Sequence, residues 1–148
     1  MTDIAHRVAY EVPKKQVFDA LSTTEGLTWW WADRVTGDPH PGGRLAFYFG
    51  GPEPAATMEV VSSDPGSGVR WRCIGGPDDW VGTTVRFDLQ ESGDETVLLF
   101  THEGFASTTD FMRHCSVKWA LYLAGLKAGL EGGEPTPRSK VKPISSWG

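Results

Sequence analysis

The sequence has little cysteine and no long apolar run. Cys73 and Cys115 are its only two cysteines, and the polar, alternating N-terminus MTDIAHRVAYEV lacks the apolar core of a secretory signal. No stretch approaches the roughly 20 apolar residues that a membrane-spanning helix needs. We therefore expect a cytoplasmic protein with two free, buried thiols and no membrane insertion.

The chain also lacks a surplus of basic residues. Its formal net charge is −5, whereas a general nucleic-acid binder needs a basic face to displace counterions, so nucleic acid is excluded as a partner. His6, His40 and His114 show no metal-ligand spacing with one another or with either cysteine. No Gly-rich phosphate loop is present. We expect neither a metal nor a cofactor.

What the sequence does contain is a series of strand-like segments. Its 148 residues fit one domain. Residues 4–12 alternate between apolar and polar side chains, which is typical of a half-buried strand, and Pro13 then begins a helix over residues 14–21. Five further segments with strand character are separated by turn signals, which predicts an antiparallel meander. They are residues 44–49, 56–62, 69–74, 83–91 and 95–103.

Three consecutive tryptophans lie in a predicted second short helix. The STTE stretch at 22–25 has the serine-to-glutamate spacing of a capping box, so we expect a helix to begin there. Leu27, Trp30 and Trp31 then fall on one side of that helix, and Trp29 points away toward the surface.

A long helix is predicted from the STTD stretch at 107–110 to Glu131, where Gly132 and Gly133 end it. Its apolar stripe runs through Phe111, Cys115, Trp119, Tyr122, Leu126 and Leu130. This order predicts an α+β fold, in which a curved antiparallel sheet of about six strands wraps around the long C-terminal helix. The expected domain covers residues 1–133, and residues 134–148 form a basic, Pro-containing tail.

Six short patterns in this order resemble those of a known family. The patterns are VFDAL at 17–21, L-x-x-W-W at 27–31, GG-R at 42–44, T-H-x-G-F at 101–105, W-x-x-x-L-x-x-L-K at 119–127 and LEGG at 130–133. The chain is thereby similar to the START-like (SRPBCC) superfamily, in its branch of activators of the heat-shock-protein-90 ATPase, from about residue 4 to 138. Two departures are Lys118, where that branch usually has Gly, and the extra Trp29.

The resemblance implies the helix-grip fold of that superfamily and a small-molecule binding protein. Members of the superfamily hold lipids, hormones, polyketides or other hydrophobic molecules between the sheet and the long helix, so we expect a hydrophobic or aromatic ligand. A first alternative is a co-chaperone or protein-interaction module that binds a chaperone, with a role in the stress response. A second is a cyclase- or hydrolase-like enzyme, with His102 as general base and Tyr122 or Tyr48 as hydrogen-bond donor.

The predicted ligand-binding residues are those that strand alternation, the helix stripe and the family pattern direct into this cavity. They are Trp30, Trp31, Phe47, Phe49, Trp71, Cys73, Phe87, Phe100, His102, Phe111, Cys115, Trp119 and Tyr122. For His102, a structural role with satisfied hydrogen bonds is favoured over a catalytic one.

Two features leave a homodimer open. The family pattern directs Leu98, Phe100 and His102 inward, which leaves Val97 and Leu99 on the outer face as a possible subunit contact. The tail carries Trp147, which we expect to pack either on its own sheet or on a second subunit.

Overall fold

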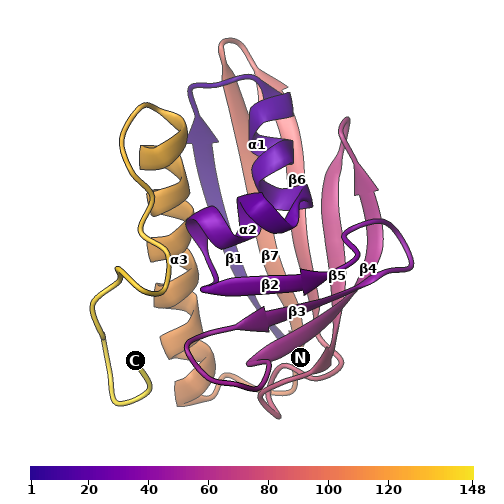
Figure 1. Ribbon diagram of the computed structural model, residues 1–148, viewed down its shortest axis with the longest axis vertical. Coiled ribbons are helices and arrows are strands. Elements are labelled where there is room, and N and C mark those ends of the chain that lie inside the picture. Colours follow the sequence, from indigo (N-terminus) through magenta and orange to yellow (C-terminus); the bar gives the residue numbers. More distant parts are fainter.

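A curved sheet wraps around one long helix in the computed structural model, which describes residues 1–148 (Figure 1). The predicted α+β helix-grip fold is thus confirmed. The strands are β1 (Thr2–Tyr10), β2 (Arg34–Gly37), β3 (Arg44–Tyr48), β4 (Ala56–Asp64), β5 (Gly68–Gly75), β6 (Thr84–Ser92) and β7 (Glu95–Phe105). The helices are α1 (Lys14–Ser22), α2 (Thr24–Trp30) and α3 (Asp110–Leu130).

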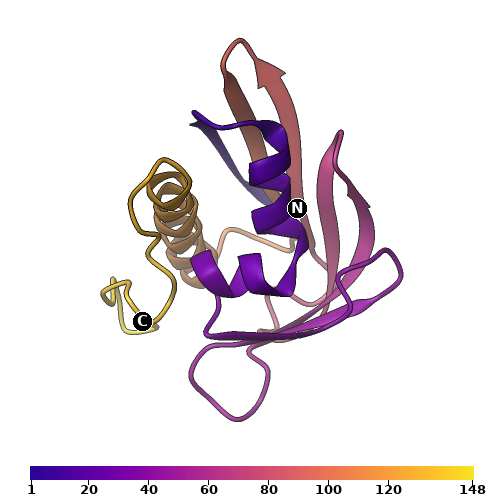
Figure 2. The ribbon, with the colours of Figure 1, turned by 45° about the horizontal axis from the view of Figure 1, so that its top comes forward.

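The sheet is fully antiparallel in the order β1-β7-β6-β5-β4-β3-β2. The strands from β3 to β7 form the predicted meander, β2 extends it at one edge, and β1 closes the far edge by pairing with β7. The β6–β7 hairpin turns at Gly93, whose φ of 62° lies in the left-handed region that glycine adopts readily. The view of Figure 2 shows the sheet curling away from α3 toward β2 and β3.

The sequence predicts six strands, and the structure has a seventh. Strand β2 is only four residues long and pairs with β3 from Arg34↔Tyr48 to Gly37↔Leu45. The Arg34 guanidinium lies 3.9 Å from the centre of the Tyr48 ring. A strand this short shows too little alternation to be recognised, so it is identified only by its pairing with β3.

The second short helix begins one residue later than predicted. Thr23, rather than Ser22, caps α2, and its hydroxyl accepts a hydrogen bond from the Gly26 N–H at 3.0 Å. Gly26 lets α2 approach α1 closely, because a Cβ there would lie 2.7 Å from the Ala20 Cα. The Trp30 indole N–H donates to the Ala20 carbonyl at 2.9 Å, which joins the two helices.

Helix α3 begins where the sequence predicts. The Thr109 hydroxyl accepts a hydrogen bond from the Met112 N–H at 3.1 Å and donates to Asp79 at 2.7 Å. Trp119 lies centrally on its buried face and is 2% exposed. No helix of the structure is both long enough and apolar enough to cross a membrane.

The strand residues predicted to face inward form the core, and both cysteine thiols are free and buried. The prediction for β7 is wrong at one position. Val97 is fully buried between Ala9 of β1 and Gln90 of β6, because both flanking strands screen this short side chain. Leu99 is 39% exposed on the outer face, so the two do not form an exposed pair.

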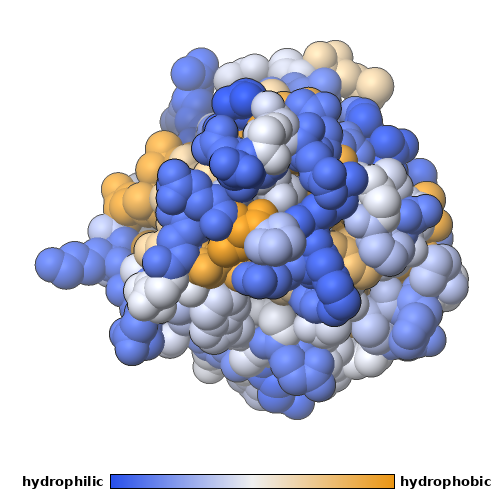
Figure 3. Space-filling view, turned by 90° about the horizontal axis from the view of Figure 1, so that it is seen from above, coloured by the Kyte–Doolittle hydropathy of each residue, from blue (hydrophilic) through white to orange (hydrophobic).

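Large exposed hydrophobic side chains are scattered over the remaining surface. Examples are Val61 on β4, Val117 and Leu121 on α3, and Trp147 in the tail. The face that is uppermost in Figure 1 is mainly hydrophilic, with hydrophobic residues in small separate groups (Figure 3). That face offers no large continuous apolar patch.

The C-terminal tail (residues 134–148) lies beside α3 (Figures 1 and 2). It can approach the helix because Gly125 and Gly129 face it. A Cβ at Gly125 would lie 2.8 Å from the Thr136 nitrogen, and one at Gly129 would lie 2.9 Å from the Pro135 ring. Farther along, the Arg138 N–H donates to the Trp31 carbonyl at 2.8 Å.

The tail tryptophan contacts the long helix rather than the sheet. The Trp147 ring lies edge-on to Phe111 and His114, with ring centroids 5.6 and 5.7 Å apart. Within the chain, the expected contact of Trp147 with the sheet is therefore replaced by a contact with α3. Trp147 remains 55% exposed.

Candidate functional site

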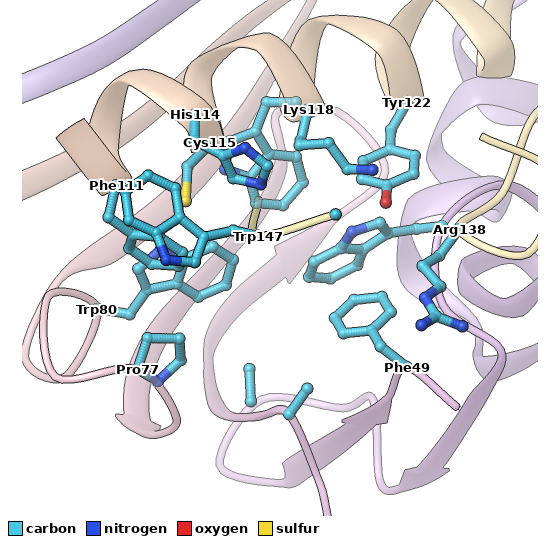
Figure 4. Close-up of a pocket in the computed structure, with 15 residues that line it drawn as sticks. Phe49, Pro77, Trp80, Phe111, His114, Cys115, Lys118, Tyr122, Arg138 and Trp147 are labelled. Carbon is cyan, nitrogen blue, oxygen red and sulfur yellow. The ribbon is translucent and has the colours of Figure 1, made fainter. Parts of the chain in front are cut away.

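A pocket of about 360 Å³ opens between α3, the ends of β3 and β4, the β5–β6 loop and the tail (Figure 4). Ten of its fifteen lining residues are hydrophobic. The lining comprises Trp31, Phe49, Ala55, Ala56, Pro77, Trp80, Phe111, His114, Cys115, Lys118, Trp119, Tyr122, Arg138, Trp147 and Gly148.

One wall of the pocket is a single face of α3. Phe111, Cys115, Lys118 and Tyr122 follow one another at spacings of three or four residues, which places their side chains on the same side of the helix (Figure 4). Helical periodicity predicted three members of this wall, Phe111, Cys115 and Tyr122, from the sequence.

Trp31 forms the inner end of the pocket. It follows α2 directly, and its ring lies 4.8 Å from that of Trp119 and 4.6 Å from that of Phe47, measured between centroids. It also stacks on Trp30 at 6.0 Å. Of the three consecutive tryptophans, Trp30 fills the core, Trp31 lines the pocket, and Trp29 lies over Gly129 of α3 with 42% of its surface exposed.

The structure divides the thirteen predicted site residues into two groups. Six line the pocket: Trp31, Phe49, Phe111, Cys115, Trp119 and Tyr122. Seven lie in the core behind it: Trp30, Phe47, Trp71, Cys73, Phe87, Phe100 and His102.

The division has a direct physical cause. The middle of the sheet packs against α3 without a gap, as the 4.6 Å separation of the Phe100 and Trp119 rings shows. The pocket therefore lies at the open end near β3, β4 and the tail. It does not reach the seven core residues that we expected to line it.

His102 is a fully satisfied structural histidine. The Trp119 indole N–H donates to its Nδ1 at 3.2 Å, so Nδ1 is unprotonated and Nε2 carries the proton. Nε2 in turn donates to the Thr83 hydroxyl at 2.8 Å, and that hydroxyl donates to the Trp80 carbonyl. Burial lowers the pKa of His102 to about 3. Neither nitrogen is free to act as a general base.

The structure also separates the groups that the enzyme alternative requires. His102 does not line the pocket, and Tyr48 lies on β3 beneath Arg34. Tyr122 does line it, but burial raises its pKa to about 12, so it remains a neutral hydroxyl. The base and donor expected of a cyclase or hydrolase are therefore not brought together.

Nine lining residues were not predicted from the sequence: Ala55, Ala56, Pro77, Trp80, His114, Lys118, Arg138, Trp147 and Gly148. His114 and Lys118 lie one helical turn from predicted residues, so helical spacing could have identified them. Trp80 lies in the GPDDW turn, and Arg138 and Trp147 lie in the tail. No local pattern indicates that these loops fold over the end of α3.

The polar groups of the pocket are concentrated on α3 and the tail (Figure 4). The Lys118 ammonium lies 5.4 Å from the centre of the Tyr122 ring, and burial together with nearby Arg138 lowers the pKa of Lys118. The His114 Nδ1 is 2.7 Å from the Ser145 hydroxyl. Burial raises the pKa of the Cys115 thiol to about 11, which keeps it neutral. No three His, Cys, Asp or Glu side chains lie close enough to hold a metal ion.

Comparison with models of known protein families identifies the family of this chain. The family model described as "Activator of Hsp90 ATPase homolog 1-like protein" matches residues 11–131. The chain belongs to this family. The match confirms the branch of the START-like superfamily that the sequence patterns predict.

Solved structures of similar fold agree with this assignment. The Aha1 dimer of Colwellia psychrerythraea is 35% identical, over 90% of this chain and 98% of that one, with a TM-score of 0.81. CalU16 of Micromonospora echinospora is 26% identical, over 90% of this chain and 76% of that one, with a TM-score of 0.68. A Staphylococcus saprophyticus protein shares the fold at 18% identity over 92% and 97% of the two chains, with a TM-score of 0.74. No curated protein matches the sequence.

The tail residues of the pocket lie beyond the family match. The matched region ends at residue 131, while Arg138, Trp147 and Gly148 all line the pocket. In this member of the family, the shared fold supplies the helix and sheet walls, and the tail supplies part of the mouth.

Proposed function

We propose that this protein binds a hydrophobic or aromatic small molecule in the pocket between α3, the sheet edge and the tail. The observation that carries the proposal is the pocket itself, which measures about 360 Å³ with ten hydrophobic residues among fifteen. Ligand sites in proteins typically have this size and this mixture of apolar walls with a few polar groups.

The aromatic lining favours a planar ligand. Trp31, Trp80 and Trp119 offer large rings, and Phe49 and Phe111 lie at opposite sides of the opening (Figure 4). Aromatic side chains gain interaction energy from offset or edge-to-face contacts in addition to the apolar area that they bury. A flat, unsaturated molecule can make such contacts with several walls at once.

The pocket can be tested with an uncharged fluorescent probe, N-phenylnaphthylamine. Ala55 is only partly buried and lines the pocket, so Ala55→Trp should fill the cavity with little effect on folding. Ala106→Trp adds the same ring at an exposed position away from the pocket and serves as the matched control.

We expect saturable binding to the wild-type chain and to Ala106→Trp, and binding at least about ten-fold weaker to Ala55→Trp, equivalent to ~1.4 kcal/mol. Equal binding to all three folded proteins would place the probe elsewhere and overturn the proposal.

A second candidate is a co-chaperone function, favoured by the family match and by the 35% identity to the Colwellia psychrerythraea Aha1 dimer. It would act through the outer surface, in the cytoplasm and in the stress response, and it includes assembly as a homodimer. Its test is stimulation of an Hsp90-type ATPase by the wild-type chain and by Ala55→Trp. Equal stimulation by both proteins supports this candidate, and no stimulation by either rejects it.

A further inference from the structure

We infer that the pocket selects an aromatic acid, whose anionic group binds between Lys118 and Arg138 at the mouth. The inference rests on the proposed ligand-binding function and names the chemical class of the ligand. The shared chemistry is a negatively charged oxygen group, such as a carboxylate or sulfonate, attached to a planar apolar body.

The charged side chains of the lining are of one sign. Lys118 and Arg138 both line the pocket, and no Asp or Glu is among the fifteen lining residues. None of the ion pairs of the structure involves Lys118. This ammonium is half-buried and faces an aromatic ring rather than a carboxylate.

Arg138 is held in place by contacts on one side of its guanidinium. Its Nη1 lies 3.3 Å from the Asp33 carboxylate. A Cβ at Gly50 would lie 2.8 Å from the same nitrogen, so the guanidinium rests against the Gly50 backbone. Only Nη1 is engaged by Asp33, so a guanidinium with five N–H donors has further donors for a ligand.

The other polar groups of the lining can also donate hydrogen bonds. The Trp80 indole N–H is buried without a well-formed hydrogen bond, and the neighbouring Cys115 thiol is at best a weak acceptor for it. Tyr122 contributes a neutral hydroxyl. A lining of cations and donors is complementary to a ligand that supplies negatively charged acceptors.

Electrostatic repulsion between the two cations gives an anion a further advantage. Burial and the nearby Arg138 both lower the pKa of Lys118, which means that the protein environment disfavours its charged form. An anion between the two groups would offset that repulsion. A neutral ligand would leave it in place.

The two cations differ in their relation to the family match. Lys118 lies within the matched residues 11–131, and Arg138 lies beyond them. The matched region therefore supplies only one of the two cations of the proposed subsite.

The test compares two probes that share an aromatic framework. Anilinonaphthalene sulfonate carries a sulfonate, and N-phenylnaphthylamine is uncharged. The variants are Lys118→Met, which keeps the length of the side chain, and Arg138→Gln. The control is Lys140→Gln, which removes the same charge from the tail at a residue that does not line the pocket. Sulfonate binding that survives in Ala55→Trp is subtracted, because it occurs outside the pocket.

We expect each pocket variant to weaken sulfonate binding about ten-fold, with binding of the uncharged probe changed less than about two-fold and Lys140→Gln without effect. Added salt should weaken the sulfonate probe alone. Unchanged sulfonate affinity in Lys118→Met would overturn the inference and leave the proposed function standing. If neither probe binds the wild-type pocket, the proposed function itself fails.

Discussion

Among single residues, His102 shows most clearly how a polar side chain is accommodated in this core. It is fully buried, yet both ring nitrogens have partners, supplied by Trp119 and Thr83. Burial without these partners would cost free energy, because unsatisfied polar groups are expensive inside proteins. The histidine links β7, α3 and the loop before β6, so its role is structural.

This burial predicts a pH-dependent stability. The pKa of His102 is lowered from 6.5 to about 3 in the folded chain, so the unfolded chain takes up a proton first as the pH falls. The stabilisation is therefore complete above about pH 6.5 and is lost as the pH falls toward 3. Urea unfolding should show that the unfolding free energy of His102→Gln depends less on pH than that of the wild-type chain. The two slopes should differ by up to about 1.4 kcal/mol per pH unit.

The control for this experiment is His40→Gln, because His40 is exposed and lies outside the core. Its pH dependence should match that of the wild-type chain. If His102→Gln retains the full wild-type slope, the buried neutral histidine described above is not the source of the pH dependence.

The structure corrects the prediction that both cysteines line the ligand cavity. Cys73 lies in the core and does not line the pocket, whereas Cys115 does. A large side chain at Cys73 would therefore crowd the core instead of filling the ligand site, which is why Ala55 is the better position to block.

At the scale of elements, α3 forms both the core and the pocket wall. Its central Trp119 contacts the rings of Trp31 and Phe100, with centroids 4.8 and 4.6 Å away. We expect Trp119→Ala to lower the free energy of unfolding by roughly 3–5 kcal/mol, the range for removing a large core aromatic. Chemical denaturation measures this loss.

Val117→Ala on the exposed side of the same helix is the matched control, since Val117 is 50% exposed. It should change the unfolding free energy by less than about 0.5 kcal/mol. A loss below about 1 kcal/mol for Trp119→Ala would contradict the packing of α3 on the sheet.

Elements with a strong periodic pattern could be predicted from the sequence. The stripe of α3 and the alternation of β3, β5 and β6 predicted the buried faces. Strand β2 could not be predicted from the sequence, because its four residues acquire their structure from pairing with β3. The cap of α2 was misplaced by one residue for a different reason, because Ser22 and Thr23 have similar capping ability.

The position of the pocket depends on the whole molecule. The sequence identified Trp31 and most of the pocket residues of α3, but not His114 and Lys118. It also included the core aromatics Phe87 and Phe100, because alternation shows only that a residue faces inward. Whether an inward residue meets a cavity or α3 depends on how far the sheet curls. The contribution of the tail depends on contacts between segments distant in sequence.

The tail is expected to stabilise a single chain. Trp147 contacts Phe111 and His114 of its own α3, so deletion of residues 139–148 should lower the unfolding free energy by about 1 kcal/mol, as expected for partly exposed aromatic contacts. The mass in sedimentation should not change. A shift from dimer to monomer on deletion would instead mean that the tail contacts a second subunit.

The most direct test of ligand binding in this pocket uses the indole N–H resonances of the seven tryptophans. Trp31, Trp80, Trp119 and Trp147 line the pocket, whereas Trp29 and Trp30 do not. In a nuclear magnetic resonance titration with N-phenylnaphthylamine, we expect the four pocket resonances to shift to saturation together, while those of Trp29 and Trp30 stay in place. Shifts at Trp29 or Trp30 without shifts at Trp80 and Trp147, or no shifts at all, would contradict the proposed site.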